Sequence, residues 1–156
     1  MVRDIYQWIH DYGVSHQNPA NKKIHWVCVP VIMLTLLGLL SLVKFDIGGF
    51  KINSAYILIA LAWLFYLRLS IKISIGMFII SGLFLLGIYQ LEQFIGLENK
   101  TLLFIYVGVF VLAWIGQFIG HKIEGQKPSF FEDLQFLLIG PAWLLSFIYK
   151  KLGIKY

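Results

Sequence analysis

The sequence is poor in charge, because only 13% of its 156 residues are Asp, Glu, Lys or Arg, whereas 59% are hydrophobic. A soluble domain of this size has more surface than so few charged residues can cover. The apolar residues are also grouped into long runs. The composition therefore predicts an all-α integral membrane protein, with one domain over residues 1–156.

Other scarcities exclude further classes. The single Cys28 excludes a disulfide framework and a cysteine metal cluster. No glycine-rich dinucleotide motif is present. The first 26 residues lack the apolar core of a signal peptide, so none is expected. The net charge of +5 is dispersed over loops and the tail, which favours contact with the anionic headgroups of a lipid bilayer and indicates no nucleic-acid partner.

Four hydrophobic blocks predict transmembrane helices at residues 26–43, 54–69, 73–91 and 101–120. About 17–20 residues, at about 1.5 Å each, cross a hydrocarbon core of about 30 Å. Because short connections make neighbouring helices antiparallel, we expect a four-helix up-down bundle. An amphipathic helix carrying Trp8, His10 and Tyr12 precedes it. A fifth segment, 134–149, contains Gly140-Pro141 and is expected to be re-entrant or interfacial.

Four crossings return the chain to the membrane face from which it started, so the polar stretches near His25 and His121 should share that face. Basic residues are more frequent there than on the opposite side, which predicts a cytoplasmic location for both stretches. The shared face has Arg3, Lys22, Lys23, Arg68, Lys72, Lys122 and Lys127, and the opposite side has Lys44, Lys51 and Lys100.

The first polar stretch lies directly before the first apolar block. Asn18-Pro19 predicts a helix start, because Asn caps helices well and the missing N–H of Pro costs nothing at the first position. Asn21 and His25 then share a helical face. His16 precedes the break, so the chain can fold it back toward His25. The alternative is that the histidines hydrogen-bond to lipid headgroups and that Asn18 is only a cap.

The second polar stretch ends the fourth block. Gln117, His121 and Glu124 are spaced to share one helical face. Gly116 and Gly120 form a GxxxG pair, which predicts the close approach of another helix. The alternative is an interfacial helix end, with Glu124 paired to a nearby lysine in water.

Together the two stretches predict a metal site at one membrane face. Ionisable groups packed against a membrane bundle are costly unless they have a task. His16, His25, His121 and Glu124 offer three imidazoles and a carboxylate, a set suited to Fe(II), Zn or Mn. His10, on the amphipathic helix, is interpreted as structural.

The two motifs resemble those of a known family. Tyr12–His25 reads Y-G-V-S-H-x-x-P-x-N-K-x-I-H and is followed by Val29-Pro30, while Gln117–Pro128 reads Q-F-I-G-H-K-x-E-G-x-x-P. With the later G-P-A-W segment, this pattern resembles the Mpo1-like family over almost the whole chain. One departure is Ser129, which follows Pro128 where the family usually has alanine.

The resemblance implies an Fe(II)-dependent dioxygenase of fatty-acid α-oxidation, which shortens a long-chain 2-hydroxy fatty acid by one carbon with O2. It also implies that His16, His25 and His121 ligate the iron, and that Asn21, Gln117 and Glu124 are further ligands or catalytic groups around it. The implied location is the bacterial inner membrane or the endoplasmic reticulum, depending on the host.

Competing functions remain open at this stage. A zinc-dependent lipid hydrolase would use Glu124 as a general base. A small transporter would place polar residues near the bilayer midplane, but the centres of the four blocks contain almost no ionisable side chain. A lipid-binding membrane protein without catalysis is a further alternative. A haem protein fits less well, because His16 lies outside the helix that carries His25.

Overall fold

The computed structural model describes residues 3–95, 99–127 and 135–156, of which the side chains of residues 47 and 95 are not described. Within these ranges the chain forms six α-helices and one short hairpin of two strands. The elements follow one another as α1 (Ile5–Val14), α2 (Pro19–Ser41), β1 (Lys44–Ile47), β2 (Phe50–Asn53), α3 (Ser54–Leu69), α4 (Ile71–Ile95), α5 (Asn99–Glu124) and α6 (Phe136–Lys151).

Three of the described helices, α2, α4 and α5, are long and apolar enough to cross a membrane, while α3 is apolar but shorter. Large hydrophobic side chains such as Leu61, Phe78, Leu83 and Leu112 are exposed on these helices. An exposed apolar surface of this extent indicates membrane association. Each of the four hydrophobic blocks overlaps one helix. Helix α3 has the same bounds as its block, whereas α2, α4 and α5 extend beyond theirs into polar residues at one end or both.

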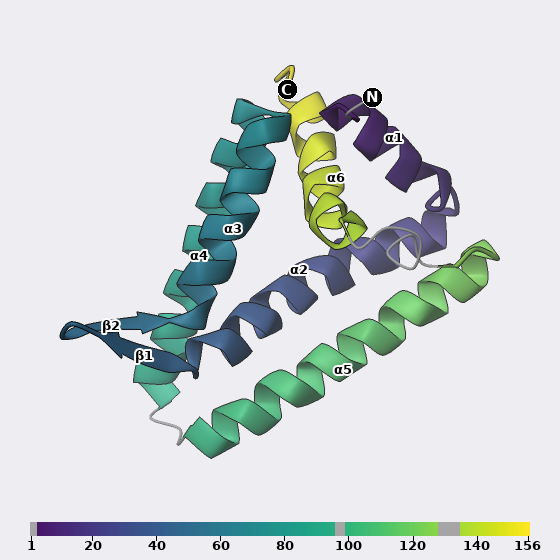
Figure 1. Cartoon of the computed structure of the whole chain (residues 1–156). Coiled ribbons are helices and arrows are strands. Elements are labelled where there is room, and N and C mark those ends of the chain that lie inside the picture. Colours follow the sequence, from purple (N-terminus) through teal and green to yellow (C-terminus); the bar gives the residue numbers. More distant parts are fainter. Residues whose placement is uncertain (1–2, 96–98, 128–134) are drawn as a thin grey trace.

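The helices form two antiparallel pairs, α2 with α5 and α3 with α4 (Figure 1). The pairs meet near the hairpin, where Leu37, Ala55 and Ile88 are buried together, and they diverge toward the other end. The expected four-helix bundle is therefore present only in part, because its two halves are splayed apart rather than closed around one core.

Helix α6 fills the space between the diverging pairs and packs against α1 and α4 (Figure 1). Its side chains form the centre of the larger hydrophobic cluster, with Ile139, Ala142 and Trp143 almost fully buried. The helix therefore lies inside the protein rather than on its surface. The predicted segment began at residue 134, which lies outside the described residues, and Pro141 is accommodated within the first two turns of α6.

Close packing of α2 against α5 depends on glycine. A Cβ atom added to Gly116 would lie 2.7 Å from the Sγ atom of Cys28, and one added to Gly120 would collide with Asn21. On the other helix, a Cβ atom added to Gly38 would lie 2.6 Å from the ring of Tyr106. The GxxxG prediction is thus confirmed, because these glycines let the two backbones approach.

The hairpin is a feature that the all-α expectation missed. Its two strands pair antiparallel, with Ile47 opposite Phe50. Gly48 and Gly49 form the turn with φ values of 61° and 85°. Two consecutive residues with positive φ make a turn whose twist matches that of the flanking strands, and glycine reaches it without steric cost.

Candidate metal centre

The break between α1 and α2 brings His16 back over the start of α2. Helix α1 ends at Val14, and the side chain of Asn18 then caps α2 by accepting a hydrogen bond of 2.9 Å from the N–H of Ala20. Pro19 occupies the first position of the helix. The predicted helix start is confirmed, and it gives His16 a direction independent of the axis of α2.

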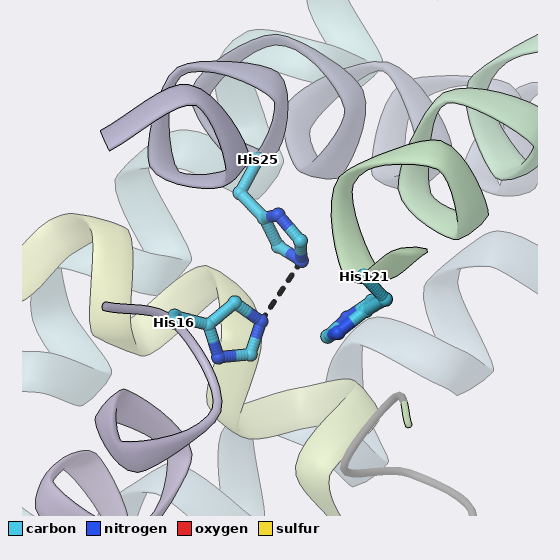
Figure 2. Close-up of side chains that lie close together, drawn as sticks. All are labelled: His16, His25 and His121. Atoms are coloured by element: carbon cyan, nitrogen blue, oxygen red, sulfur yellow. Dashed lines mark hydrogen bonds between the residues drawn. The ribbon is translucent and has the colours of Figure 1, made fainter. Parts of the chain in front are cut away.

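Three histidines meet at this end of the molecule. His16 comes from the turn, His25 from the second turn of α2, and His121 from the last turn of α5, and Figure 2 shows their rings pointing toward one another. One nitrogen from each ring lies within 4.8 Å of the others. The relative exposures of His16, His25 and His121 are 0%, 0% and 5%, so the cluster is shielded from solvent.

The hydrogen bonds around His16 and His25 fix which nitrogens carry protons. The Nδ1 atom of His16 lies 2.5 Å from the carbonyl oxygen of Tyr12, and that of His25 lies 3.0 Å from the carbonyl oxygen of Asn21. A carbonyl oxygen only accepts, so both Nδ1 atoms must carry the proton. In neutral rings both Nε2 atoms then have a bare lone pair.

These two Nε2 atoms lie 2.9 Å apart (Figure 2). Two facing lone pairs repel each other. A positive charge between the two nitrogens would turn this repulsion into attraction. A proton would supply it only by making one buried ring cationic. Burial, reinforced by the nearby His25, lowers the pKa of His16 to about 3, so its imidazole is neutral at pH 7. A metal ion shared by the two rings would satisfy both nitrogens at once.

The spacing fits a metal ion. Two nitrogens bound at about 2.1 Å and at a right angle to one another are about 3.0 Å apart. His121 adds a third imidazole, and its Nδ1 atom is buried without a hydrogen-bond partner among the described residues. An orphaned buried nitrogen costs about 1–3 kcal/mol, which coordination would offset. The donor set is thus suited to a transition metal that accepts imidazole.

Aromatic side chains form the walls of the cluster. The ring of Tyr12 stacks on His16 with the centroids 4.2 Å apart and the planes 11° apart. Trp143 of α6 covers His16 from another side at a centroid distance of 5.3 Å. These contacts exclude water and hold the His16 ring in place. Burial also raises the pKa of the Tyr12 hydroxyl, so that group stays protonated.

Glu124 lies beside the histidines but binds the backbone instead. Its carboxylate accepts hydrogen bonds from the N–H groups of Gln17 and Asn18, at 2.7 Å and 2.9 Å, and from the Nδ2 atom of Asn21 at 3.0 Å. Among the described residues, the group that could hold a metal contains the three histidines and not Glu124. In this geometry the carboxylate binds those donors, and a role for Glu124 as a fourth ligand stays a prediction.

Asn21 and Gln117 are both buried near the histidines. Asn21 links Glu124 to His25, since its Nδ2 atom donates to the carboxylate and its carbonyl oxygen accepts from the His25 ring. Its Oδ1 atom has no partner among the described residues. Gln117 and His121 line a small cavity of about 60 Å³. Both amides therefore surround the centre, and their catalytic role stays a prediction.

His10 is the histidine that does not join the cluster. Its side chain is 78% exposed and lies 3.5 Å from the carboxylate of Asp11 on the same helix. Sequence reasoning missed the parts played by Tyr12 and Trp143. The spacing of four between Tyr12 and His16 was a usable signal for the first, whereas no local pattern connects Trp143 to a histidine more than a hundred residues away.

Fold and site together define a helical, membrane-associated protein with a buried centre of three histidines. Comparison with known proteins agrees with this class. A family model described as "2-hydroxy-palmitic acid dioxygenase Mpo1-like" matches residues 2–152. The chain is also 30% identical over 146 residues to the 2-hydroxy-palmitic acid dioxygenase MPO1 of Saccharomyces cerevisiae, covering 91% of this chain and 78% of the yeast protein. No solved structure matches. The chain belongs to the Mpo1-like family.

Proposed function

We propose that this protein is a membrane-embedded, Fe(II)-dependent dioxygenase that converts a long-chain 2-hydroxy fatty acid and O2 into the fatty acid one carbon shorter. The observation that carries the proposal is the pair of facing Nε2 atoms at 2.9 Å, an arrangement that a shared cation would stabilise, in a chain of this family. The name of the yeast relative supports the substrate class.

The overall reaction balances without a further cofactor. A 2-hydroxy acid and O2 give the shorter acid, CO2 and water, so the bond between the carboxyl carbon and the carbinol carbon breaks. The four electrons released by the acid are those that O2 consumes. Iron bound by His16, His25 and His121 would supply redox chemistry with O2 and a Lewis acid for the carboxylate and 2-hydroxyl of the substrate.

The protein's own groups prepare the site for this chemistry. The carbonyl groups of Tyr12 and Asn21 hold the two rings with Nε2 unprotonated, and a fixed orientation of this kind raises the metal affinity of a histidine site. Gln117, which lines the small cavity with His121, would hydrogen-bond the polar head of the substrate. Tyr12 and Trp143 exclude water from His16. These groups, with Glu124 as a positioning residue, are the proposed catalytic surroundings.

The proposed location is a bacterial inner membrane or the endoplasmic reticulum, with the histidines toward the cytoplasm. The start of α2 and the end of α5 lie at the same end of the molecule (Figure 1). This matches the parity of four crossings, and the basic residues at that end favour the cytoplasmic side.

The first test is metal content. Protein purified anaerobically in detergent and reconstituted with Fe(II) should hold about one iron per chain, and His25→Ala or His121→Ala should lose it because two imidazoles bind far more weakly than three. His10→Ala is the matched control and should retain iron, since its side chain is exposed outside the cluster. Wild-type protein with iron should then consume O2 and release CO2 from 2-hydroxypalmitate.

Three results would contradict the proposal. Equal metal loss in all three histidine variants would remove the site as described. Retention of zinc with no oxygen consumption would favour the hydrolase. The absence of any bound metal in the wild type after anaerobic addition of Fe(II) would exclude the mechanism.

A further inference from the structure

A larger apolar cavity lies between the two helix pairs. Its volume is about 490 Å³, and α2, α3, α4, α5 and α6 all contribute to its walls. No charged side chain lines it among the described residues. The hydroxyl of Tyr66, one of its few polar groups, already donates to the carbonyl oxygen of Leu138 at 2.7 Å. The cavity is therefore suited to an apolar ligand and not to a polar one.

This cavity adjoins the small cavity beside the histidines. The residues that line both are Ile32, Met33, Trp114, Leu137 and Pro141. The small cavity in turn reaches His121 and Gln117. The two spaces thus lie side by side, with polar groups in the one beside the histidines and almost only apolar groups in the other.

The length available along the two spaces fits one acyl chain. Along α2, the twelve residues from His25 to Leu37 rise by about 18 Å at about 1.5 Å per residue. The acyl chains of one leaflet occupy about 15 Å, half of a hydrocarbon core of about 30 Å. Leu37 and Leu58 close the far end of the cavity, where both join the smaller hydrophobic cluster.

We infer that the cavity between the helix pairs holds the acyl chain of the 2-hydroxy fatty acid, with its head at the histidines, and that the far wall at Leu37 and Leu58 sets the preferred chain length. The inference rests on the proposed function for the identity of the head group. Its physical basis is the adjacency of the two cavities, which share five wall residues. A tail that lay in the bilayer would need no such apolar space beside the histidines.

The test changes the space in the cavity and leaves the metal centre unchanged. Ala62 of α3 lines the cavity, whereas Ala60 is exposed two residues away on the same helix. Ala62→Phe should lower kcat/KM for 2-hydroxypalmitate at least tenfold and change kcat/KM for 2-hydroxylaurate less than about threefold, because only the longer chain meets the new ring. Ala60→Phe should alter neither value.

A second variant shifts specificity in the opposite direction and guards against misfolding of the first. Leu58→Ala enlarges the far end and should move the preferred substrate to a longer chain, raising the ratio of kcat/KM for 2-hydroxystearate to that for 2-hydroxypalmitate by about threefold or more. Leu61→Ala, at a position that is 61% exposed, is its control. Each variant should hold the same amount of iron as the wild type.

Binding of radiolabelled 2-hydroxypalmitate without O2 separates the two proposals. Loss of 2-hydroxypalmitate binding in Ala62→Phe, with binding of 2-hydroxylaurate retained, supports the cavity as the site of the acyl chain. This holds even if the wild type turns over no substrate, because absence of turnover would contradict only the proposed function. Chain-length profiles of Ala62→Phe and Leu58→Ala that match those of their controls, in binding and in turnover, would overturn the inference. The tail would then lie in the bilayer.

Discussion

At the scale of single residues, Glu124 shows how the site is held together. Its carboxylate receives hydrogen bonds from Gln17, Asn18 and Asn21, and it thereby ties the turn that carries His16 to the end of the helix that carries His121. Hydrogen bonds to a charged group contribute about 1.5–3 kcal/mol each. We therefore propose that Glu124 is a positioning residue, which would act on a bound metal through the histidines.

Replacing this carboxylate by an amide should loosen the centre without removing a ligand. In Glu124→Gln the amide NH2 faces N–H donors and cannot accept from them, so the turn should shift and the affinity for Fe(II) should fall about 10- to 100-fold. Anaerobic titration with Fe(II) measures this affinity. Asp11→Asn removes a half-exposed carboxylate from α1 and should leave the affinity unchanged. Complete loss of binding in Glu124→Gln would instead identify Glu124 as a ligand.

Much of this site could be predicted from the sequence, but only where the signal lies in the spacing of residues within one segment. The break at Asn18-Pro19 and the spacing of Asn21 with His25 indicated that His16 and His25 could converge, and their rings do meet. The role of Glu124 could not be read in the same way. Helical spacing places a carboxylate on the correct face, but it does not show that backbone N–H groups of another segment compete for it.

At the scale of elements, the contact between α2 and α5 determines the distance between His25 and His121. Gly116 faces Cys28 at a distance that leaves no room for a methyl group. His121 lies just over one turn further along α5. Any separation of the two helices at Gly116 therefore moves His121 away from the other two histidines.

Gly116→Ala should destabilise the protein by about 1–3 kcal/mol through overpacking, and it should also weaken iron binding. Gly108 provides a control on the same helix, because a Cβ atom added there would meet nothing within 4 Å. Gly108→Ala should be neutral or slightly stabilising, since alanine is favoured over glycine inside a helix by about 0.5–1 kcal/mol. Thermal unfolding in detergent with and without Fe(II) measures both effects. Equal unfolding temperatures for the two variants would contradict the close packing at Gly116.

The elements themselves were more predictable than their limits. Long apolar runs indicated the helices, but α2 and α5 continue into polar ends, which build the histidine cluster and bury His25 and His121. The Gly48-Gly49 pair was a recognisable hairpin signal between the first and second blocks. The sequence predicted only a short connection there, because the long apolar blocks on either side determined which elements were expected.

At the scale of the whole molecule, the position of α6 could not be derived from sequence patterns. Its apolar composition fits a span, a re-entrant segment or a buried helix equally well. The deciding factor is tertiary, because the two diverging pairs leave a space that the small residues Gly140, Ala142 and Ser146 allow α6 to enter. The splaying has the same origin, since side chains from α1 and α6 occupy the opening.

The ends of the chain meet beside this helix. The rings of Tyr6 and Tyr156 stack with centroids 5.3 Å apart, and Lys72, in the first turn of α4, donates to the carbonyl oxygen of Lys155. The two termini and the turn from α3 to α4 thus lie at one end, away from the hairpin (Figure 1). This arrangement predicts that the termini share one membrane face and that α6 adds no crossing.

Labelling of single cysteines in intact bacterial cells tests this topology. In a Cys28→Ala background, an impermeant maleimide should label Lys51→Cys on the hairpin, which the positive-inside rule places outside the cytoplasm. Gln126→Cys, beyond the end of α5, and Lys155→Cys, in the tail, should react only after the cells are permeabilised. Both positions are exposed, so failure to react reflects their side of the membrane and not burial. Labelling of Lys155→Cys but not Gln126→Cys in intact cells would show that α6 crosses the membrane. The number of crossings would then be odd, and the tail would lie on the opposite side of the membrane from the histidines.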